Sequence, residues 1–394
     1  MLMGNFGAQA ISLLFYPVLV RIFDPQSFGI FGTFSSFMVI TSIFVSGQLH
    51  MAFIKCHDPQ EIKELLWVMR TYVLVGTVMA TPIVLIINFK FHYFPFYVIA
   101  LFPVALISYI ASESSKMMGV RNESFKSLST ATSGNRLGSN FFKVIIGLIH
   151  ASPLSLILSE ISANGLSAWY LHKKNPMAFS RPRSAILLLK KFRQFPLYTT
   201  FSNFFQWGLI EFPVIILAVY YQKIEIGFYV LTLKILLQPL AIIGNSVGSI
   251  TSKKLVLNHL NKDSNFKILS RIYGLYFLLG SSLFVLIYSI PDEWVTFVLG
   301  QKWAGINVVL APLALLSVAK LSSGLHVYFY IAADVIKIKS IWKAIQLSSV
   351  TLLIYLNHHL PFADLLWLIC LTDAGIDLLF TLYTVFIQAR KSHG

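Results

Sequence analysis

The sequence predicts an all-α integral membrane protein with twelve transmembrane helices arranged in two lobes of six. Three observations lead to this fold class: the composition, the lengths of the apolar stretches, and the distribution of Lys and Arg between alternate loops. Of the 394 residues, 56% are hydrophobic and only 12% are charged. Soluble domains carry about 25% charged residues, so the composition favours a chain whose surface meets lipid.

The apolar stretches have the length of membrane spans. A helix rises 1.5 Å per residue, so about 20 apolar residues cross the hydrocarbon core, which is about 30 Å thick. The stretches that meet this requirement are 2–22, 29–54, 65–88, 94–115, 126–149, 152–172, 196–220, 225–250, 270–290, 305–330, 340–358 and 363–389.

The basic residues orient these spans. Short cytoplasmic loops carry an excess of Lys and Arg. With both termini in the cytoplasm, the inner loops hold 22 basic residues and the outer loops hold four. The first stretch has no basic segment before it and no cleavage site, so we expect it to remain as a helix. The net charge of +15 then lines the inner face, where it meets anionic lipids and not nucleic acid.

The two halves of the chain resemble each other, which predicts two lobes. Pro17 and Gly29 in the first half correspond to Pro213 and Gly227 in the second, at offsets close to half the length. Six spans are an even number, so the repeats keep one orientation and are related by a pseudo-two-fold axis along the membrane normal. We expect an N-terminal lobe over 1–172, a basic cytoplasmic linker over 173–195 and a C-terminal lobe over 196–394.

Polar residues inside the fifth span are the first functional signal. Arg136, Asn140 and Lys143 recur at helical spacing, and Ser139 shares their face. Charges at this depth are costly, so the face should meet protein or water. One interpretation is a cationic strip that binds a phosphate or an acidic sugar in an aqueous cavity. The other is that the cations pair with buried carboxylates and hold helices together.

The second half also carries charges within its spans. Lys234 and Lys320 are expected to bind substrate, although the cationic character is local to the first half, because the deep acids and bases balance in number. Asp373 and Asp377 share a helix face at i and i+4, and with Lys320 they could form a structural salt-bridge network or take part in ion coupling. Glu211 precedes the helix-breaking Pro213, which suggests a protonatable switch for ion coupling. The other interpretation is that Glu211 only pairs with Lys234.

Other functional classes find little support in the sequence. Two cysteines provide neither a disulfide framework nor a thiolate metal site, and no His, Cys or Asp set has the spacing of metal ligands. The chain has no phosphate-binding loop for ATP. We therefore expect no cofactor, no metal and no enzymatic activity. A membrane polysaccharide polymerase is less favoured, because no large outer loop carries carboxylates or arginines.

Three stretches resemble the Wzx-type polysaccharide or O-antigen flippases of the multidrug/oligosaccharidyl-lipid/polysaccharide exporter superfamily. The stretches are FYPVLVRIFDPQSFGIFGTFSSF, IEIGFYVLTLKILLQPL and FVLGQKWAGINVVLAPLALL. They resemble, in order, the opening two spans of that family, the Gly-x-Tyr segment of its eighth span and the Leu-Gly-x-x-Trp motif before its tenth. The resemblance covers essentially the whole chain.

The resemblance implies a function and a set of partners. It implies a flippase of the bacterial inner membrane that moves an undecaprenyl-diphosphate-linked oligosaccharide to the outer leaflet by alternating access coupled to an ion gradient. Arg136 and Lys143 would line the cavity that receives the diphosphate or the acidic sugars. A polysaccharide polymerase and a chain-length regulator are further expected partners. The alternative is a multidrug or small-molecule antiporter with the same fold.

Overall fold

A computed structural model describes most of the chain as α-helix, in two compact units that meet in sequence at Val219 and Tyr220. The description leaves out residues 1, 57, 238, 241–242, 245–246, 249, 252–253, 256, 258–264, 333–335 and 394, and the side chains of 2–10, 322–332, 336–337 and 387–393. Over the described residues there is no β-strand.

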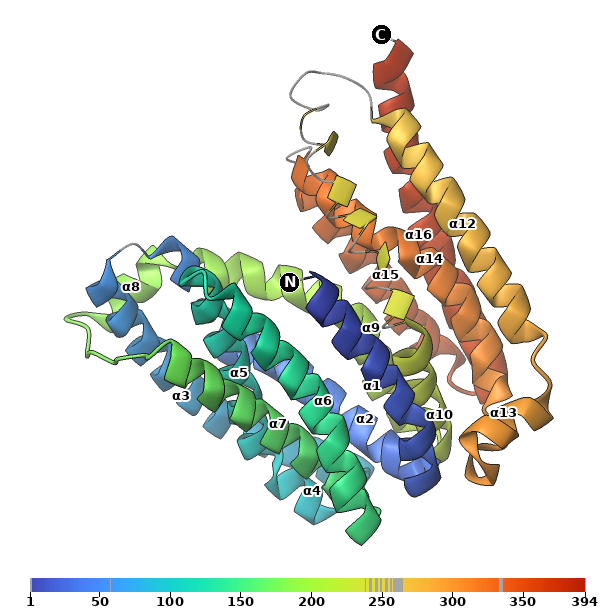
Figure 1. Cartoon of the computed structure of the whole chain (residues 1–394), viewed down its shortest axis with the longest axis horizontal. Coiled ribbons are helices and arrows are strands. Elements are labelled where there is room, and N and C mark those ends of the chain that lie inside the picture. The colour runs from blue at the N-terminus through green and yellow to red at the C-terminus, as the bar shows by residue number, and fades with distance from the viewer. Residues whose placement is uncertain are drawn as a thin grey trace. The chain divides into compact units, whose positions relative to one another are not determined.

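The first unit, Met1–Val219, consists of long helices joined by short turns (Figure 1). Its elements are α1 (Leu2–Ile22), α2 (Pro25–Ser46), the 3₁₀-helix η1 (Leu49–Lys55), α3 (Pro59–Phe91), α4 (Phe96–Ala100), α5 (Phe102–Arg121), α6 (Phe125–Ile149), α7 (Pro153–Lys174), α8 (Ala185–Lys191), the π-helical turn η2 (Phe195–Thr199) and α9 (Thr200–Tyr220).

The second unit, Tyr220–Gly394, is likewise helical wherever it is described. Its elements are α10 (Lys223–Thr232), the π-helical turn η3 (Leu233–Leu237), α12 (Phe266–Tyr288), α13 (Asp292–Leu299), the 3₁₀-helix η4 (Gln301–Trp303), α14 (Asn307–Ala332), α15 (Ile336–Asn357) and α16 (Phe362–His393).

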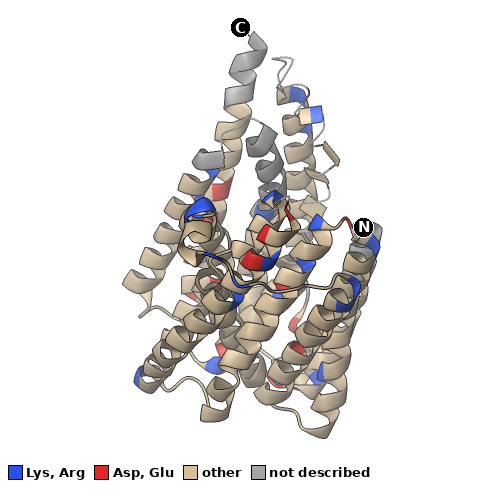
Figure 2. Ribbon diagram, turned by 90° about the vertical axis from the view of Figure 1, so that its left-hand side faces the viewer, with Lys and Arg blue, Asp and Glu red and all other residues tan. Residues whose placement is uncertain are grey.

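Over the described residues, helices lie along most of each predicted span, and several boundaries agree within a few residues. The predicted span 225–250 lies partly outside the described residues. Six helical segments in the described chain are long and apolar enough to cross a membrane. Figure 2 shows long stretches of ribbon without a charged residue between the few blue and red positions. The number of twelve spans, the pseudo-two-fold axis and the lobe boundaries at 172 and 196 stay predictions. The contacts of residues 196–219 group them with the first unit.

The predicted span 29–54 is wrong at both ends. Helix α2 begins four residues earlier, because Asp24 accepts the backbone N–H of Ser27 at 2.7 Å and Pro25 has the φ angle of a first helical residue. It ends at Ser46, since Gly47 adopts φ +50°, and the apolar residues that follow form η1. Hydropathy alone could not reveal this break, because apolar residues lie on both sides of it.

Helices α1 and α6 approach each other closely at Gly147. A methyl group at this position would lie 2.5 Å from Cζ of Phe23 and 2.9 Å from Cγ2 of Ile22. Phe23 is fully buried, so its ring has no free space into which it could move. The glycine therefore sets the distance between the two helices at the end of α6.

The substitution Gly147→Ala is expected to destabilise the protein by about 1–3 kcal/mol, because the added methyl overpacks this contact. Gly134→Ala in the same helix is the matched control. No atom lies within 4 Å of a methyl at Gly134, and alanine favours helix by up to about 1 kcal/mol. Thermal unfolding of the purified proteins should give a lower midpoint for Gly147→Ala alone. Equal midpoints would contradict the close approach.

Candidate functional site

Helix α6 carries a polar face that becomes more buried along its length. Its first turns, through Lys126, Ser129 and Thr130, border a hollow that is wide open to solvent. Two turns after Ser129 on the same face, Arg136 is half-buried, and two turns further Lys143 is 8% exposed. From Lys126 to Lys143 the face extends for about 25 Å. The predicted strip is thus one continuous face whose exposure falls with depth.

At the buried end, Lys143 has a carboxylate partner. Its Nζ lies 2.9 Å from Oε2 of Glu160 on α7, and Oγ of Ser139 donates to the same oxygen at 2.7 Å. The ammonium also lies 4.9 Å from the ring centroid of Phe31, a cation–π distance. Lys143 therefore fits the structural interpretation, in which a buried carboxylate neutralises the cation and ties α6 to α7.

Arg136 differs from Lys143 in lacking such a partner. Within the described part of the chain, its guanidinium forms no ion pair with a carboxylate. A half-buried guanidinium keeps its charge and presents up to five N–H donors in a planar fork. The site thus provides one unneutralised cation midway along the polar face. Asn140, one turn away, is 8% exposed and adds an amide beside it.

Glu160 also lines a small pocket, on the side of α7 that faces α2 and α5. The pocket has an empty volume of about 210 Å³, and its polar lining comes from Ser35, Ser108, Glu160 and Asn164. Asn164 is held by Asn135, whose amide donates to it at 2.9 Å. The carboxylate of Glu160 therefore both pairs with Lys143 and lines this pocket.

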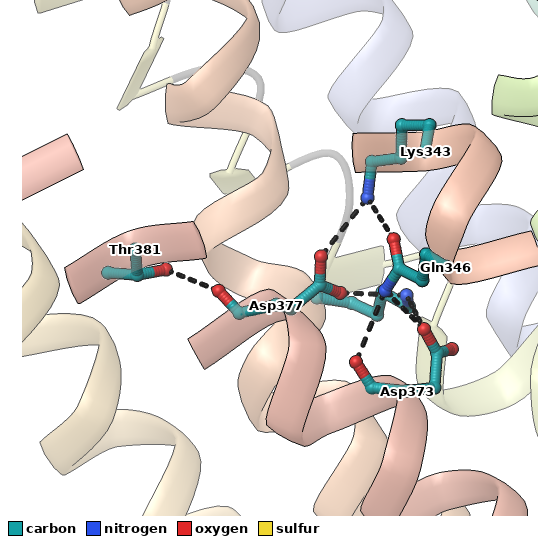
Figure 3. Close-up of polar contacts among 6 residues, drawn as sticks. Lys343, Gln346, Asp373, Asp377 and Thr381 are labelled. Carbon is teal, nitrogen blue, oxygen red and sulfur yellow. Dashed lines mark hydrogen bonds and ion pairs between the residues drawn. The ribbon is translucent and has the colours of Figure 1, made fainter. Parts of the chain in front are cut away.

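The second unit contains a buried network of ionic groups (Figure 3). Nζ of Lys320 on α14 lies 2.9 Å from Asp373 and 2.8 Å from Asp377, both on α16. Nζ of Lys343 on α15 lies 3.1 Å from Asp377. Gln346 accepts from Lys343 at 2.8 Å and donates to Asp373. The network contains two cations and two carboxylates, so its charges balance.

The contact of Lys320 with both Asp373 and Asp377 agrees with the predicted network, whereas the place of Lys343 is a correction. Among the 22 bases assigned to inner loops is Lys343, which lies just inside the expected span 340–358. The structure places it 8% exposed inside α15, beside Gln346, which is 1% exposed. Their i and i+3 spacing was visible in the sequence, but the excess of nearby bases made Lys343 look like loop charge. Lys320 is consequently neutralised by carboxylates and is a weaker candidate for binding an anion.

Glu211 and Lys234 lie in two other places. Oγ of Ser36 on α2 donates to Oε2 of Glu211 on α9 at 2.7 Å, half a turn before Pro213. Lys234 is half-buried in the π-helical turn η3. π-helical turns are rare in proteins, and those that occur often lie at functional sites. The predicted residues therefore belong to different surroundings: the α6 face, the α2–α9 contact, the turn η3 and the buried network.

An apolar pocket in the first unit contributes no charge. Its empty volume is about 340 Å³, and aromatic side chains of Phe37, Phe91, Tyr93 and Phe94 form much of its wall. Burial raises the pKa of Tyr93 to about 12, so the hydroxyl stays protonated at neutral pH. This pocket therefore suits hydrocarbon better than a charged group.

Comparisons with known proteins give a family and a fold. A family model described as "Polysaccharide biosynthesis protein" matches residues 18–308. No curated protein sequence matches the chain.

Solved structures with a similar fold include a flippase and transporters. The lipid II flippase MurJ in an inward closed conformation is 14% identical with a TM-score of 0.74, over 99% of this chain and 89% of that one. An inward-facing multidrug resistance MATE family transporter of the MOP superfamily is 11% identical with a TM-score of 0.69, over 98% and 96%. A eukaryotic MATE transporter is 11% identical with a TM-score of 0.53, over 98% and 99%. At these identities the likeness is one of fold.

Proposed function

Because the chain belongs to the polysaccharide biosynthesis protein family, we propose that it is a flippase for an undecaprenyl-diphosphate-linked oligosaccharide. It would move this lipid from the cytoplasmic to the outer leaflet of a bacterial inner membrane during assembly of O-antigen or capsule. The fold shared with a lipid II flippase supports a transport function, although fold alone does not specify a substrate.

The single observation that carries the proposal is the half-buried Arg136 on the polar face of α6. A guanidinium binds phosphate through two parallel N–H donors, and such charge-assisted bonds are about twice as strong as neutral ones. The turns before it, at Lys126 and Ser129, border an open hollow. We place the diphosphate at Arg136, with Ser139 and Asn140 as neutral partners. Lys143 would attract it more weakly, because Glu160 neutralises its charge.

The remaining predicted residues take supporting roles in this proposal. Lys234 is a further substrate-binding cation. Lys320 would attract an anion only weakly, because Asp373 and Asp377 neutralise its charge. Glu211 is the favoured ion-coupling group, since its hydrogen bond from Ser36 joins two helices close to a proline. Protonation of its carboxylate would weaken that bond. The roles of Asp373 and Asp377 in coupling stay predictions.

A deletion strain tests the function. Cells that lack the protein should accumulate the lipid-linked repeat unit on the cytoplasmic side and lose surface polysaccharide, while synthesis of the repeat unit continues. The measurement is the amount of extracted lipid-linked oligosaccharide, compared with that in a strain carrying the gene on a plasmid. Normal surface polysaccharide together with altered sensitivity to toxic cations would contradict the proposal and favour the antiporter alternative.

A further inference from the structure

The segment 173–193 between α7 and α9 combines a high positive charge with exposed apolar side chains. It contains seven basic residues and no acidic residue. The basic residues are Lys173, Lys174, Arg181, Arg183, Lys190, Lys191 and Arg193. Within it, the short helix α8 leaves Ile186 79% exposed and Leu187 68% exposed, and Phe179 is 47% exposed.

One side of this segment is fixed to the start of α3. The backbone N–H of Ser180 donates to the carbonyl of Lys63 at 3.1 Å, and Gln60 donates to Oγ of Ser180 at 3.1 Å. Lys191 forms an ion pair with Glu61, and Leu188 is buried. The segment 173–193, called the strap below, is therefore packed against the start of α3. These contacts fix the orientation of α8.

The other side of α8 points away from this contact. Ile186, Leu187 and Lys190 are adjacent on a helix at i, i+1 and i+4, and all three are exposed. Leaving the aliphatic side chains of Ile186 and Leu187 exposed to water would cost free energy. Basic residues that flank exposed apolar ones are typical of helices lying in the interface of an anionic bilayer.

The position of the strap along the chain brings it close to the bilayer. It docks on the first turns of α3, and it ends two residues before Phe195, where the next apolar segment begins. Both Pro59–Phe91 and Phe195–Tyr220 are long and apolar enough to cross a membrane. A segment tied to the ends of two such helices lies at headgroup depth, where Lys and Arg meet lipid phosphates.

We propose that residues 173–193 form an interfacial strap that binds anionic lipid headgroups, with Ile186 and Leu187 inserted among the upper acyl carbons. The basic side chains Arg183, Lys190 and Arg193 would contact the phosphates. This inference is independent of the substrate that the protein carries.

Limited trypsin digestion of the full-length protein in lipid nanodiscs tests the strap. Cleavage after Arg183, Lys190, Lys191 or Arg193 divides the chain near its middle, and cleavage after the exposed Lys302 serves as the internal reference. Relative to Lys302, cleavage in the strap should be at least about fivefold slower with one quarter phosphatidylglycerol than with phosphatidylcholine alone. About 0.5 M salt should remove most of the difference by screening.

A variant separates insertion from charge alone. Ile186→Ser combined with Leu187→Ser keeps all seven bases, and it should lose most of the protection that phosphatidylglycerol gives. Full protection in this variant would overturn the insertion of α8. Equal cleavage of the wild-type strap in both lipids would overturn lipid binding and would leave the surface for an acidic protein partner.

Discussion

Asp377→Ala is expected to produce the largest loss of stability among the single substitutions considered. Asp377 is 1% exposed and accepts from both Lys320 and Lys343. Without this carboxylate, Lys343 stays buried. Among the described network residues, only Gln346 then accepts a hydrogen bond from it. Breaking one side of a buried ion pair costs about 3–5 kcal/mol, because the remaining charge stays desolvated. The midpoint of thermal unfolding in detergent should fall accordingly.

A matched control and a compensating pair make this prediction specific. Asp364→Ala removes an exposed carboxylate from the first turn of the same helix and should change stability by less than about 1 kcal/mol. The pair Asp377→Leu with Lys343→Met removes one charge of each sign and should recover most of the lost stability. A drop for Asp377→Ala no larger than that for Asp364→Ala would contradict the role of the network.

The same compensating pair separates the two interpretations of the network. If the ionic groups only hold α14, α15 and α16 together, the pair should restore both stability and export of polysaccharide. If Asp377 takes part in ion coupling, stability should recover while export stays absent. The comparison uses one protein preparation and one export assay, so the two results are directly comparable.

Arg136→Ala is expected to reduce surface polysaccharide at least about tenfold while the protein still inserts and accumulates. One charge-assisted hydrogen bond contributes about 1.5–3 kcal/mol, which corresponds to about 10- to 160-fold in the rate of a step that depends on it. Because no described carboxylate pairs with Arg136, its removal leaves no unpaired buried charge behind. Surface polysaccharide in the deletion strain carrying each variant is the measurement.

Three further variants test whether the charge or the geometry of Arg136 is responsible for that result. Arg136→Met keeps the length of the side chain and should be as inactive as Arg136→Ala if the charge matters. Arg136→Lys should retain part of the activity if charge is sufficient, and little if two parallel N–H donors are needed. Lys302→Ala removes an exposed cation far along the chain and should export normally. Normal export by Arg136→Ala would show that the α6 face is structural.

Local patterns predicted many of the helices well because long apolar runs coincide with them along the chain. The spans at 2–22, 126–149 and 152–172 agree closely with α1, α6 and α7. The predicted span 65–88 is shorter than α3, which also includes the polar residues that follow Asp58. Asp58 caps the N-terminus of α3 and lies outside the apolar run. Asp58 followed by Pro59 was a visible signal for that start.

Partners of buried charges were harder to predict than the charges themselves. The i and i+4 spacing placed Asp373 and Asp377 on one face, and the contact with Lys320 followed. Glu160 was one of several carboxylates available to Lys143, and only the packing of α6 against α7 selects it. Lys343 was missed because Lys337 and Lys339 lie shortly before it in the sequence. Which helix lies beside which depends on long-range packing, which spacing within one helix cannot reveal.

The central claim is that this chain moves a lipid-linked oligosaccharide past a cation on α6. Its most direct test is translocation of a fluorescent polyprenyl-diphosphate oligosaccharide in vesicles that contain only the purified protein, followed by quenching from outside. We predict that the wild-type protein exposes the inner-leaflet label much faster than protein-free vesicles, and that Arg136→Ala falls to the protein-free rate. A wild-type rate equal to that of empty vesicles, or an Arg136→Ala rate equal to the wild-type rate, would contradict the claim.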